Sequence, residues 1–184
     1  MARIEPVSFV DPRGRLIAVR NCVAGDGMVS IEFIRAIARE TTFTNNLPDR
    51  KFSPAEEIER SWVAALDDAN QLHVAAFCDG VMIGQLVCRR LEPGHPYIGH
   101  IARFGMMVLR EFWGSGAARK LADGMDQYAQ SQGIGRIEAV VRVDNVRGRR
   151  FYGKVGFVEE GTRGRAARIG DTWVDEIYIG KLYR

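Results

Sequence analysis

The sequence predicts a single α/β (α+β) domain, in which a mixed, mostly antiparallel sheet of about seven strands packs against about four helices. Its 184 residues correspond to one ordinary domain. Apolar residues make up 46% and charged residues 27%, a composition that excludes a disordered chain and a coiled coil. An antiparallel meander is expected before residue 100, and strands alternate with helices after it. We therefore expect one domain over residues 1–184.

The first predicted elements are a strand, a helix, a polar loop and a second helix. The strand spans Leu16–Val23, the helix spans Asp26–Glu40, and the loop spans Thr41–Phe52. Ser53 can cap the second helix in a capping box with Glu56, and the intervening proline suits a first turn. Apolar residues at helical spacing would form its inner face, namely Ile58, Trp62, Ala65 and Leu66.

Three strands are predicted in the middle of the chain. Gln71–Cys78 and Val81–Arg90 flank Asp79-Gly80, a dipeptide that favours a tight hairpin. After a turn-rich break at residues 93–96, the third strand spans Tyr97–Val108. Together these strands form the expected meander.

Helices and strands alternate in the C-terminal part. The longest helix is predicted over Ser115–Gln132 and ends at a glycine. Ile137–Val143 is almost continuously apolar, which predicts a central strand buried on both faces. A short helix follows from about Asn145 to Val155. The last two strands are expected near Phe157–Arg168 and Trp173–Leu182.

Composition limits the partners of the chain. Lys and Arg number 26 against 23 for Asp and Glu, and a net charge of +3 is weak support for nucleic-acid binding. The three cysteines, Cys22, Cys78 and Cys88, have no metal-binding spacing, so we expect free thiols and no metal. The segment up to Val10 lacks the apolar core of a signal peptide, and no apolar run is long enough to span a membrane. We expect a cytoplasmic protein without membrane association.

The most informative stretch joins a strand to the long helix. The strand ends in Gly105-Met106-Met107-Val108, and after a four-residue linker comes Trp113-Gly114-Ser115-Gly116-Ala117-Ala118. Small side chains at a helix N-terminus let unpaired backbone N–H groups approach a phosphate closely, although a turn that only packs the helix would have the same composition. Two known phosphate loops do not fit, because the chain has no GxxxxGK and because Arg119 stands where a dinucleotide fingerprint needs glycine.

These residues resemble the GNAT superfamily of acetyl-CoA-dependent N-acetyltransferases. Val108 followed by Gly116 and Ala118 is similar to the family's loop motif, with Trp113 in place of the usual arginine or glutamine. A second and a third motif resemble the family at Asn145, Tyr152, Gly156-Phe157 and residues 170–175. The third is typical of amino-acid and protein-terminus acetyltransferases. The resemblance covers roughly residues 70–182.

The resemblance implies the GNAT fold, with acetyl-CoA lying where the fourth and fifth strands splay apart, near Val108 and Ile137. The implied cofactor-binding residues are Met106, Met107, Val108, Trp113, Gly114, Ser115, Gly116, Ala117, Ala118 and Asn145. The strand backbone would hold the pantetheine arm and polarise the thioester carbonyl, and the loop would cradle the pyrophosphate. Asn145 would either hydrogen-bond the cofactor or only cap the next helix.

Tyr152 is the catalytic residue that the resemblance implies. A phenol with a pKa near 10 can protonate the departing thiolate, whose thiol has a pKa near 8.5. The alternative is an aromatic side chain that only packs beside Phe151 and Phe157.

The general base is less evident. Relatives often place a carboxylate where this chain has Arg103, which instead suggests an acceptor that carries a carboxylate or another anion. The proton of the amine could be taken through water by a carboxylate or a histidine, or the amine could bind already neutral. The candidates are Glu40, His100, Asp175 and Glu176.

The implied reaction moves acetyl from acetyl-CoA to a primary amine by direct attack in a ternary complex. A free amino acid or related small amine is the first expectation, and helices within residues 24–70 would shape its site. A peptide or protein N-terminus and a non-catalytic acyl-CoA sensor are the alternatives.

Residues 136–184 hold eleven basic and seven acidic residues, which either attract the phosphates of CoA or form a solvated face. Nucleic acid is not expected as a partner, and a homodimer is compatible with the resemblance.

Overall fold

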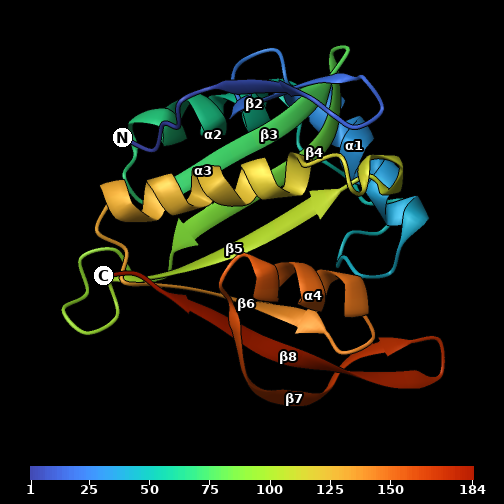
Figure 1. Cartoon of the computed structure of the whole chain (residues 1–184), viewed down its shortest axis with the longest axis vertical. Coiled ribbons are helices and arrows are strands. Elements are labelled where there is room, and N and C mark those ends of the chain that lie inside the picture. The colour runs from blue at the N-terminus through green and yellow to red at the C-terminus, as the bar shows by residue number, and fades with distance from the viewer.

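The computed structural model covers residues 1–184 and contains eight strands and four α-helices (Figure 1). The strands are β1 (Val7–Val10), β2 (Leu16–Asn21), β3 (Gln71–Cys78), β4 (Val81–Arg90), β5 (Ile101–Val108), β6 (Arg136–Arg142), β7 (Val158–Ile169) and β8 (Thr172–Leu182). The helices are α1 (Gly27–Glu40), α2 (Ala55–Asp67), α3 (Ala117–Ser131) and α4 (Val146–Lys154). A short 3₁₀ turn, η1 (Arg110–Phe112), follows β5. This confirms the predicted fold class.

All eight strands form one sheet that is split in the middle. Their order is β1-β2-β3-β4-β5-β6-β8-β7, and β5–β6 is the only parallel pair. This pairing joins only residues 101–103 to residues 136–138. Farther along, β5 pairs only with β4 and β6 only with β8, so the two strands separate toward their C-terminal ends (Figure 1). The splay between the predicted fourth and fifth strands is confirmed.

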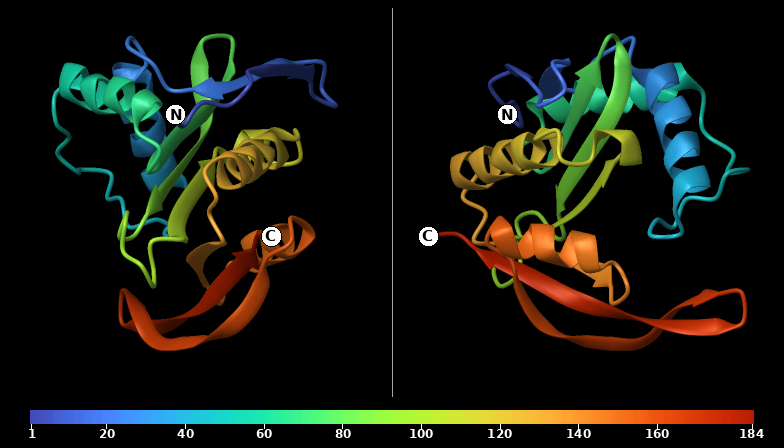
Figure 2. Two further views of the ribbon diagram at one scale, coloured as in Figure 1. Left: turned by 90° about the vertical axis from the view of Figure 1, so that its left-hand side faces the viewer. Right: turned by 45° about the vertical axis from the view of Figure 1, so that its right-hand side comes forward.

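The split divides the molecule into two halves with separate helices. The N-terminal half, residues 1–131, carries α1 and α2 on one face of the sheet and α3 on the other (Figure 2). Phe33 and Trp62 of α1 and α2 pack on Phe77 and Met82 of the sheet. The C-terminal half, residues 136–184, carries α4 on the same face as α3. The face that carries α3 and α4 holds the larger core.

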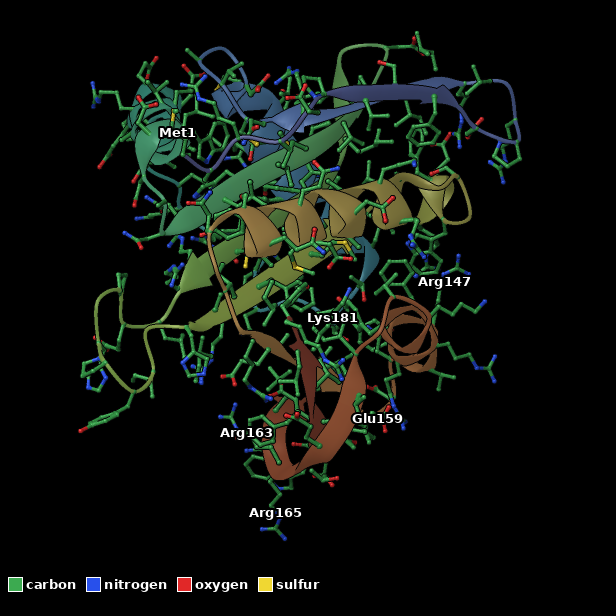
Figure 3. The ribbon with its side chains drawn as sticks, turned by 60° about the vertical axis from the view of Figure 1, so that its left-hand side comes forward. Met1, Arg147, Glu159, Arg163, Arg165 and Lys181 are labelled. Carbon is green, nitrogen blue, oxygen red and sulfur yellow. The ribbon has the colours of Figure 1, made fainter.

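A polar cluster ties the halves together at the closed end of the split. The Lys181 ammonium group of β8 donates to both carboxylate oxygens of Asp126 in α3, at 2.7 and 2.8 Å. The Tyr183 hydroxyl donates to the same carboxylate at 2.7 Å. Figure 3 places Lys181 between α3 and the C-terminal strands. The closed end is therefore fixed by side chains as well as by the three residue pairs of the parallel β5–β6 ladder.

The sheet has eight strands where about seven were expected, and the additional strand is β1, a four-residue edge strand too short to give a clear alternation. Two sequence expectations about the elements are wrong. Ser53 does not cap α2, because the helix begins at Ala55 and the N-cap position is occupied by Pro54, which has no side-chain acceptor. Neither is β6 buried on both faces: Val140 is 43% exposed, because α1 and α2 cover β3 and β4 instead.

His73 makes the core of the N-terminal half sensitive to acid. Its side chain is buried near Trp62, its Nδ1 atom has no hydrogen-bond partner, and burial, with a smaller effect of Arg89, lowers its pKa to about 4. An unfolded histidine has a pKa of about 6.5, so between these values the unfolded chain binds more protons. We expect the free energy of unfolding to fall by up to about 3 kcal/mol as the pH drops from about 6.5 to about 4.

Urea unfolding at pH 7 and pH 4.5 measures this loss. In His73→Leu the loss between the two pH values should become smaller, because the buried imidazole is gone. His100→Gln is the matched control, since His100 is exposed. If His73→Leu loses as much stability in acid as the wild type, His73 is not the sensitive group.

Candidate active site

The backbone of β5 is free along one side of the split. Residues 104–108 have no strand partner on the side of β6. A side chain added at Gly105 would meet no atom within 4 Å, so the sheet surface is open at this point. An unpaired strand edge offers N–H and C=O groups to an extended ligand. Met106, Met107 and Val108, the predicted pantetheine-binding residues, all lie on this edge.

On the face that carries α3 and α4, the split is lined by apolar side chains. The lining comes from β4, β5, both helices and the turn after α4, and consists of Leu86, Phe104, Met106, Ala122, Met125, Phe151, Tyr152, Val155 and Phe157. The space between them is too narrow for a water molecule. It therefore suits a thin apolar or amide-containing chain that separates the two helices slightly as it enters.

The loop before α3 presents free backbone donors. Gly114 and Gly116 have left-handed φ angles of +83° and +95°, which glycine adopts readily. The N–H groups of residues 114, 116, 118 and 119 have no hydrogen-bond partner within the chain. Four free donors at a helix N-terminus form a site for an anion such as a pyrophosphate.

Two of the predicted loop residues hold the shape of the loop and are turned inward. Ser115 and Ala117 are buried, and the Ser115 hydroxyl accepts the N–H of Ala117 at 3.2 Å. The free N–H of Arg119 was not among the predicted contacts. A backbone donor leaves no mark in the residue type, and only the helix start at Ala117 reveals it.

The Trp113 side chain spans the open end of the split. Its indole N–H donates to the carbonyl of Val108 at 3.0 Å, which ties the loop to the end of β5. The Arg147 guanidinium of α4 lies over the indole ring, 4.6 Å from its centroid. Figure 3 shows Arg147 at the end of α4 that faces the loop before α3. The family-atypical Trp113 thus acts through its side chain as well as its backbone.

A hairpin at the N-terminus braces the same loop and was not foreseen in the sequence. The ring of Phe9 in β1 lies against Gly116, 3.2 Å from where a Cβ atom would sit. The guanidinium of Arg15 lies 3.9 Å from the centroid of the Phe112 ring and bonds the carboxylate of Glu111 at 3.2 Å. These contacts join residues about a hundred positions apart, so no local pattern indicates them.

Asn145 is the N-cap of α4. Its side-chain oxygen accepts the N–H of Gly148 at 2.9 Å, while its amide nitrogen has no partner within the chain. The helix then carries three basic side chains, Arg147, Arg150 and Lys154, that are exposed and form no ion pair. Their spacing puts them on one stripe of α4. Most other arginines of this half are paired with carboxylates, so the free positive charge gathers on α4.

Tyr152 lies at the boundary between the two halves. Its ring meets those of Phe104 and Phe157 at centroid distances of 5.5 and 5.8 Å, and its hydroxyl has no hydrogen-bond partner within the chain. Burial in these apolar surroundings raises the pKa of Tyr152 to about 12, so the phenol is protonated at every physiological pH. An unpartnered phenol in an apolar cleft is available to donate one hydrogen bond to a ligand.

Three of the four predicted proton acceptors are engaged elsewhere. Glu40 accepts the N–H of Arg110 at 2.9 Å and holds the start of η1. Asp175 accepts the N–H of Arg165 at 2.7 Å within the β7–β8 hairpin. His100 lies at the closed end, where its carbonyl accepts the N–H of Gly135. Glu40 and Asp175 therefore lie near the open end with a carboxylate oxygen already bonded to a backbone N–H, and His100 lies away from it.

Glu176 and Arg103 lie on the face of the sheet opposite α4. Glu176 of β8 pairs in register with Arg142 at the end of β6, and its largely buried carboxylate bonds Arg163 at 3.3 Å. Arg103 bonds Glu138 at 2.9 Å and keeps 63% of its side chain exposed. Between them lie Val140 and Tyr178, which are also exposed. This face offers charged ends and an apolar middle.

The structure contains neither a candidate metal site nor a helix suited to a membrane. No group of three or more His, Cys, Asp or Glu side chains is arranged to hold a metal ion. No helix has the length and apolar character needed to cross a membrane. The three cysteines are buried and free, as predicted.

Comparisons with known proteins agree with the geometry. Residues 32–157 match the Acetyltransferase (GNAT) family. The L-amino acid N-acetyltransferase AaaT of Escherichia coli (strain K12) is 29% identical over 129 residues, which are 67% of this chain and 76% of that protein.

Two solved structures show the same fold. A GNAT-family acetyltransferase from Streptococcus pneumoniae superimposes with a TM-score of 0.84 at 25% identity, covering 91% of this chain and 99% of the other. The yncA protein of Salmonella typhimurium, solved with its cofactor acetyl-CoA, gives a TM-score of 0.76 at 16% identity over 90% and 93% of the two chains.

Proposed function

The chain belongs to the GNAT acetyltransferase family and is an acetyl-CoA-dependent N-acetyltransferase, and we propose that its acceptor is a free amino acid or a related small amine. One observation carries the assignment of the cofactor site. The unpaired edge of β5 leads directly into a loop with four free N–H groups. The name of the relative from Escherichia coli supports an amino acid as acceptor.

The residues present fit acetyl-CoA, which supplies an activated thioester when bound. The free N–H groups of residues 114, 116, 118 and 119 would hold its pyrophosphate. The free edge of β5 at 106–108 would hold the pantetheine arm, and a backbone N–H there would polarise the thioester carbonyl. The free basic side chains of α4 would attract the remaining phosphate, with Trp113 and the amide nitrogen of Asn145 beside the entrance.

The chemical step requires one proton donor and one proton acceptor. The amine nitrogen attacks the acetyl carbonyl carbon, a C–N bond forms and the C–S bond breaks. Tyr152 would donate its phenolic proton to the departing sulfur, which its unpartnered, protonated hydroxyl supports. Of the four predicted acceptors of the amine's proton, Glu176 is our candidate because it lies on the open face beside the end of β6, and it would act through water.

The acceptor would lie on the sheet face opposite α4, beneath the loop that joins α1 and α2. This agrees with the expectation that residues 24–70 shape the acceptor site. The exposed guanidinium of Arg103 would attract an acceptor carboxylate. It would then bond both that carboxylate and the carboxylate of Glu138. A peptide N-terminus is the second candidate, because this face is open to solvent along Val140 and Tyr178.

Release of free thiol from acetyl-CoA tests the acceptor class. The panel should pair each amino acid with its decarboxylated amine and with a short peptide that begins with the same residue. We expect turnover on free amino acids, and a larger loss for amino acids than for amines in Arg103→Ala. Turnover on peptides alone would assign the alternative, and acetyl-CoA binding without thiol release on any amine would indicate a sensor. Equal losses in Arg103→Ala would exclude Arg103 from carboxylate recognition.

The cysteines bear on the cellular compartment that we propose for the protein. Three buried free thiols suit the reducing cytoplasm. Small-molecule amines would be its partners, and a homodimer is compatible with the exposed sheet face.

A further inference from the structure

Arg142 bridges the two halves at the open end of the split. Its Nη1 donates to the carbonyl and the hydroxyl of Thr42 at 2.9 and 3.1 Å, across a sequence separation of 100 residues. All other hydrogen bonds between the halves lie at the closed end, around Gln132–Arg136, Glu138 and Lys181–Tyr183. Arg142 is therefore the only hydrogen-bonded connection where the strands have separated.

The bridge is rigid. Asp144 accepts from Nε and Nη2 of Arg142 at 3.0 and 2.6 Å in a bidentate pair, which fixes the plane of the guanidinium. The Arg142 side chain is 9% exposed, so it is largely shielded from solvent competition. The guanidinium also lies over the ring of Phe43, 5.0 Å from the centroid. One side chain thus holds two consecutive loop residues.

The held segment is the α1–α2 loop, residues 41–54. It extends from the end of α1 toward the end of β6 (Figure 1). Its only other side-chain link to the sheet is a weak one, from the Asn46 amide to the sulfur of Met107 at 3.9 Å. The Phe43 ring is 43% exposed and lies above the same face as Val140. The position of this apolar group over the open face depends on Arg142.

We propose that Arg142 is a positioning residue that fixes the α1–α2 loop as the wall of the acceptor site, and thereby sets acceptor affinity without contacting acetyl-CoA. The inference rests on the proposed function, since it gives this face to the acceptor. Lysine cannot replace arginine here, because one ammonium group cannot engage Asp144 in bidentate fashion and reach Thr42 as well.

Arg136 provides the matched control. It lies on the same strand and face, and it also bonds a carboxylate two residues on, Glu138, at 3.1 Å. Its second partner is Glu160, at the closed end, and it does not touch the loop. Arg136→Gln therefore removes a comparable ion pair without releasing residues 41–54.

Two measurements test the proposal on the full chain. In Arg142→Gln and Arg142→Lys we expect the acceptor KM to rise about tenfold while the acetyl-CoA KM stays within about twofold. Amide hydrogen exchange of residues 41–54 should become about tenfold faster in both variants and stay unchanged in Arg136→Gln. Phe43→Ala should also raise the acceptor KM, and it should fold normally because Phe43 is half-exposed. This variant therefore tests the role of the loop even if the arginine variants unfold.

The outcomes separate the bridge from the assigned reaction. Unchanged exchange of residues 41–54 in the Arg142 variants overturns the bridge, whatever amine the enzyme uses. Equal increases in both KM values, or a loss confined to kcat, overturn its role in acceptor binding. Wild-type enzyme that acetylates no free amino acid overturns the proposed acceptor alone, because the exchange comparison does not depend on turnover.

Discussion

Replacing Tyr152 by phenylalanine is expected to lower kcat by about tenfold or more while leaving the KM for acetyl-CoA nearly unchanged. The variant keeps the ring that packs between Phe104 and Phe157 and loses only the hydroxyl, which has no partner within the chain. The folded state should therefore be as stable as before. Steady-state kinetics with saturating amine, together with thermal unfolding, measure both quantities.

The elevated pKa of Tyr152 refines this expectation. Burial raises the pKa of the phenol to about 12, which makes it a weaker acid than in water. The phenol therefore stays protonated over the working range, and kcat should show no loss from Tyr152 ionisation up to about pH 10.

The matched control for Tyr152→Phe is Tyr97→Phe. Tyr97 is 81% exposed in the turn before β5, so the loss of its hydroxyl should leave kcat unaltered. If Tyr152→Phe turns over like the wild type, the phenol is not the proton donor. A fall in Tm with unchanged kcat per folded molecule would assign Tyr152 to packing alone.

Replacing Gly116 by valine should weaken acetyl-CoA binding by more than about tenfold. The residue has a φ of +95°, and its Cβ would lie 3.2 Å from the ring of Phe9. A β-branched side chain would strain the backbone and displace the loop whose N–H groups are aimed at the pyrophosphate. Isothermal titration with CoA measures the dissociation constant directly, without an acceptor.

Gly133→Val separates strain from site damage. Gly133 has a φ of +62° at the other end of α3, and its added Cβ would meet no atom within 4 Å. It should lose stability through the same backbone strain but keep its affinity for CoA. Equal affinities in Gly116→Val and the wild type would show that this loop does not bind the pyrophosphate.

The local patterns in the sequence were sufficient for most of the fold. The Asp79-Gly80 hairpin forms as predicted, with both residues at positive φ. The long helix α3 buries Leu121 and Met125 at helical spacing. The parallel β5–β6 pair with its splay followed from the resemblance and not from any local pattern. The edge strand β1 was missed because four half-exposed residues carry little periodicity.

The site was only partly predictable for a related reason. Small residues at 114–118 indicated a close backbone approach, and three of the four free N–H groups lie there. Contacts made by long polar side chains across the molecule have no local signal. Arg142 reaches Thr42 over 100 positions, and Arg15 reaches Glu111 over 96. Arg103 was considered as an isolated cation, whereas the parallel register places Glu138 beside it.

Because β5 and β6 pair over only three residues, a small rotation of one strand against the other at the paired end produces a larger displacement at the open end. Five residues of extended strand separate Arg103, the last paired residue, from Val108, a distance of about 17 Å. A rotation of about 3° at the paired end thus moves Val108 by about 1 Å, and a misplacement of that size can cost about a hundredfold in rate. The Lys181–Asp126–Tyr183 cluster lies at the paired end, where such a rotation would be centred. Residues remote from Tyr152 therefore influence, together with the Arg142 bridge, how far β5 and β6 stand apart at the open end.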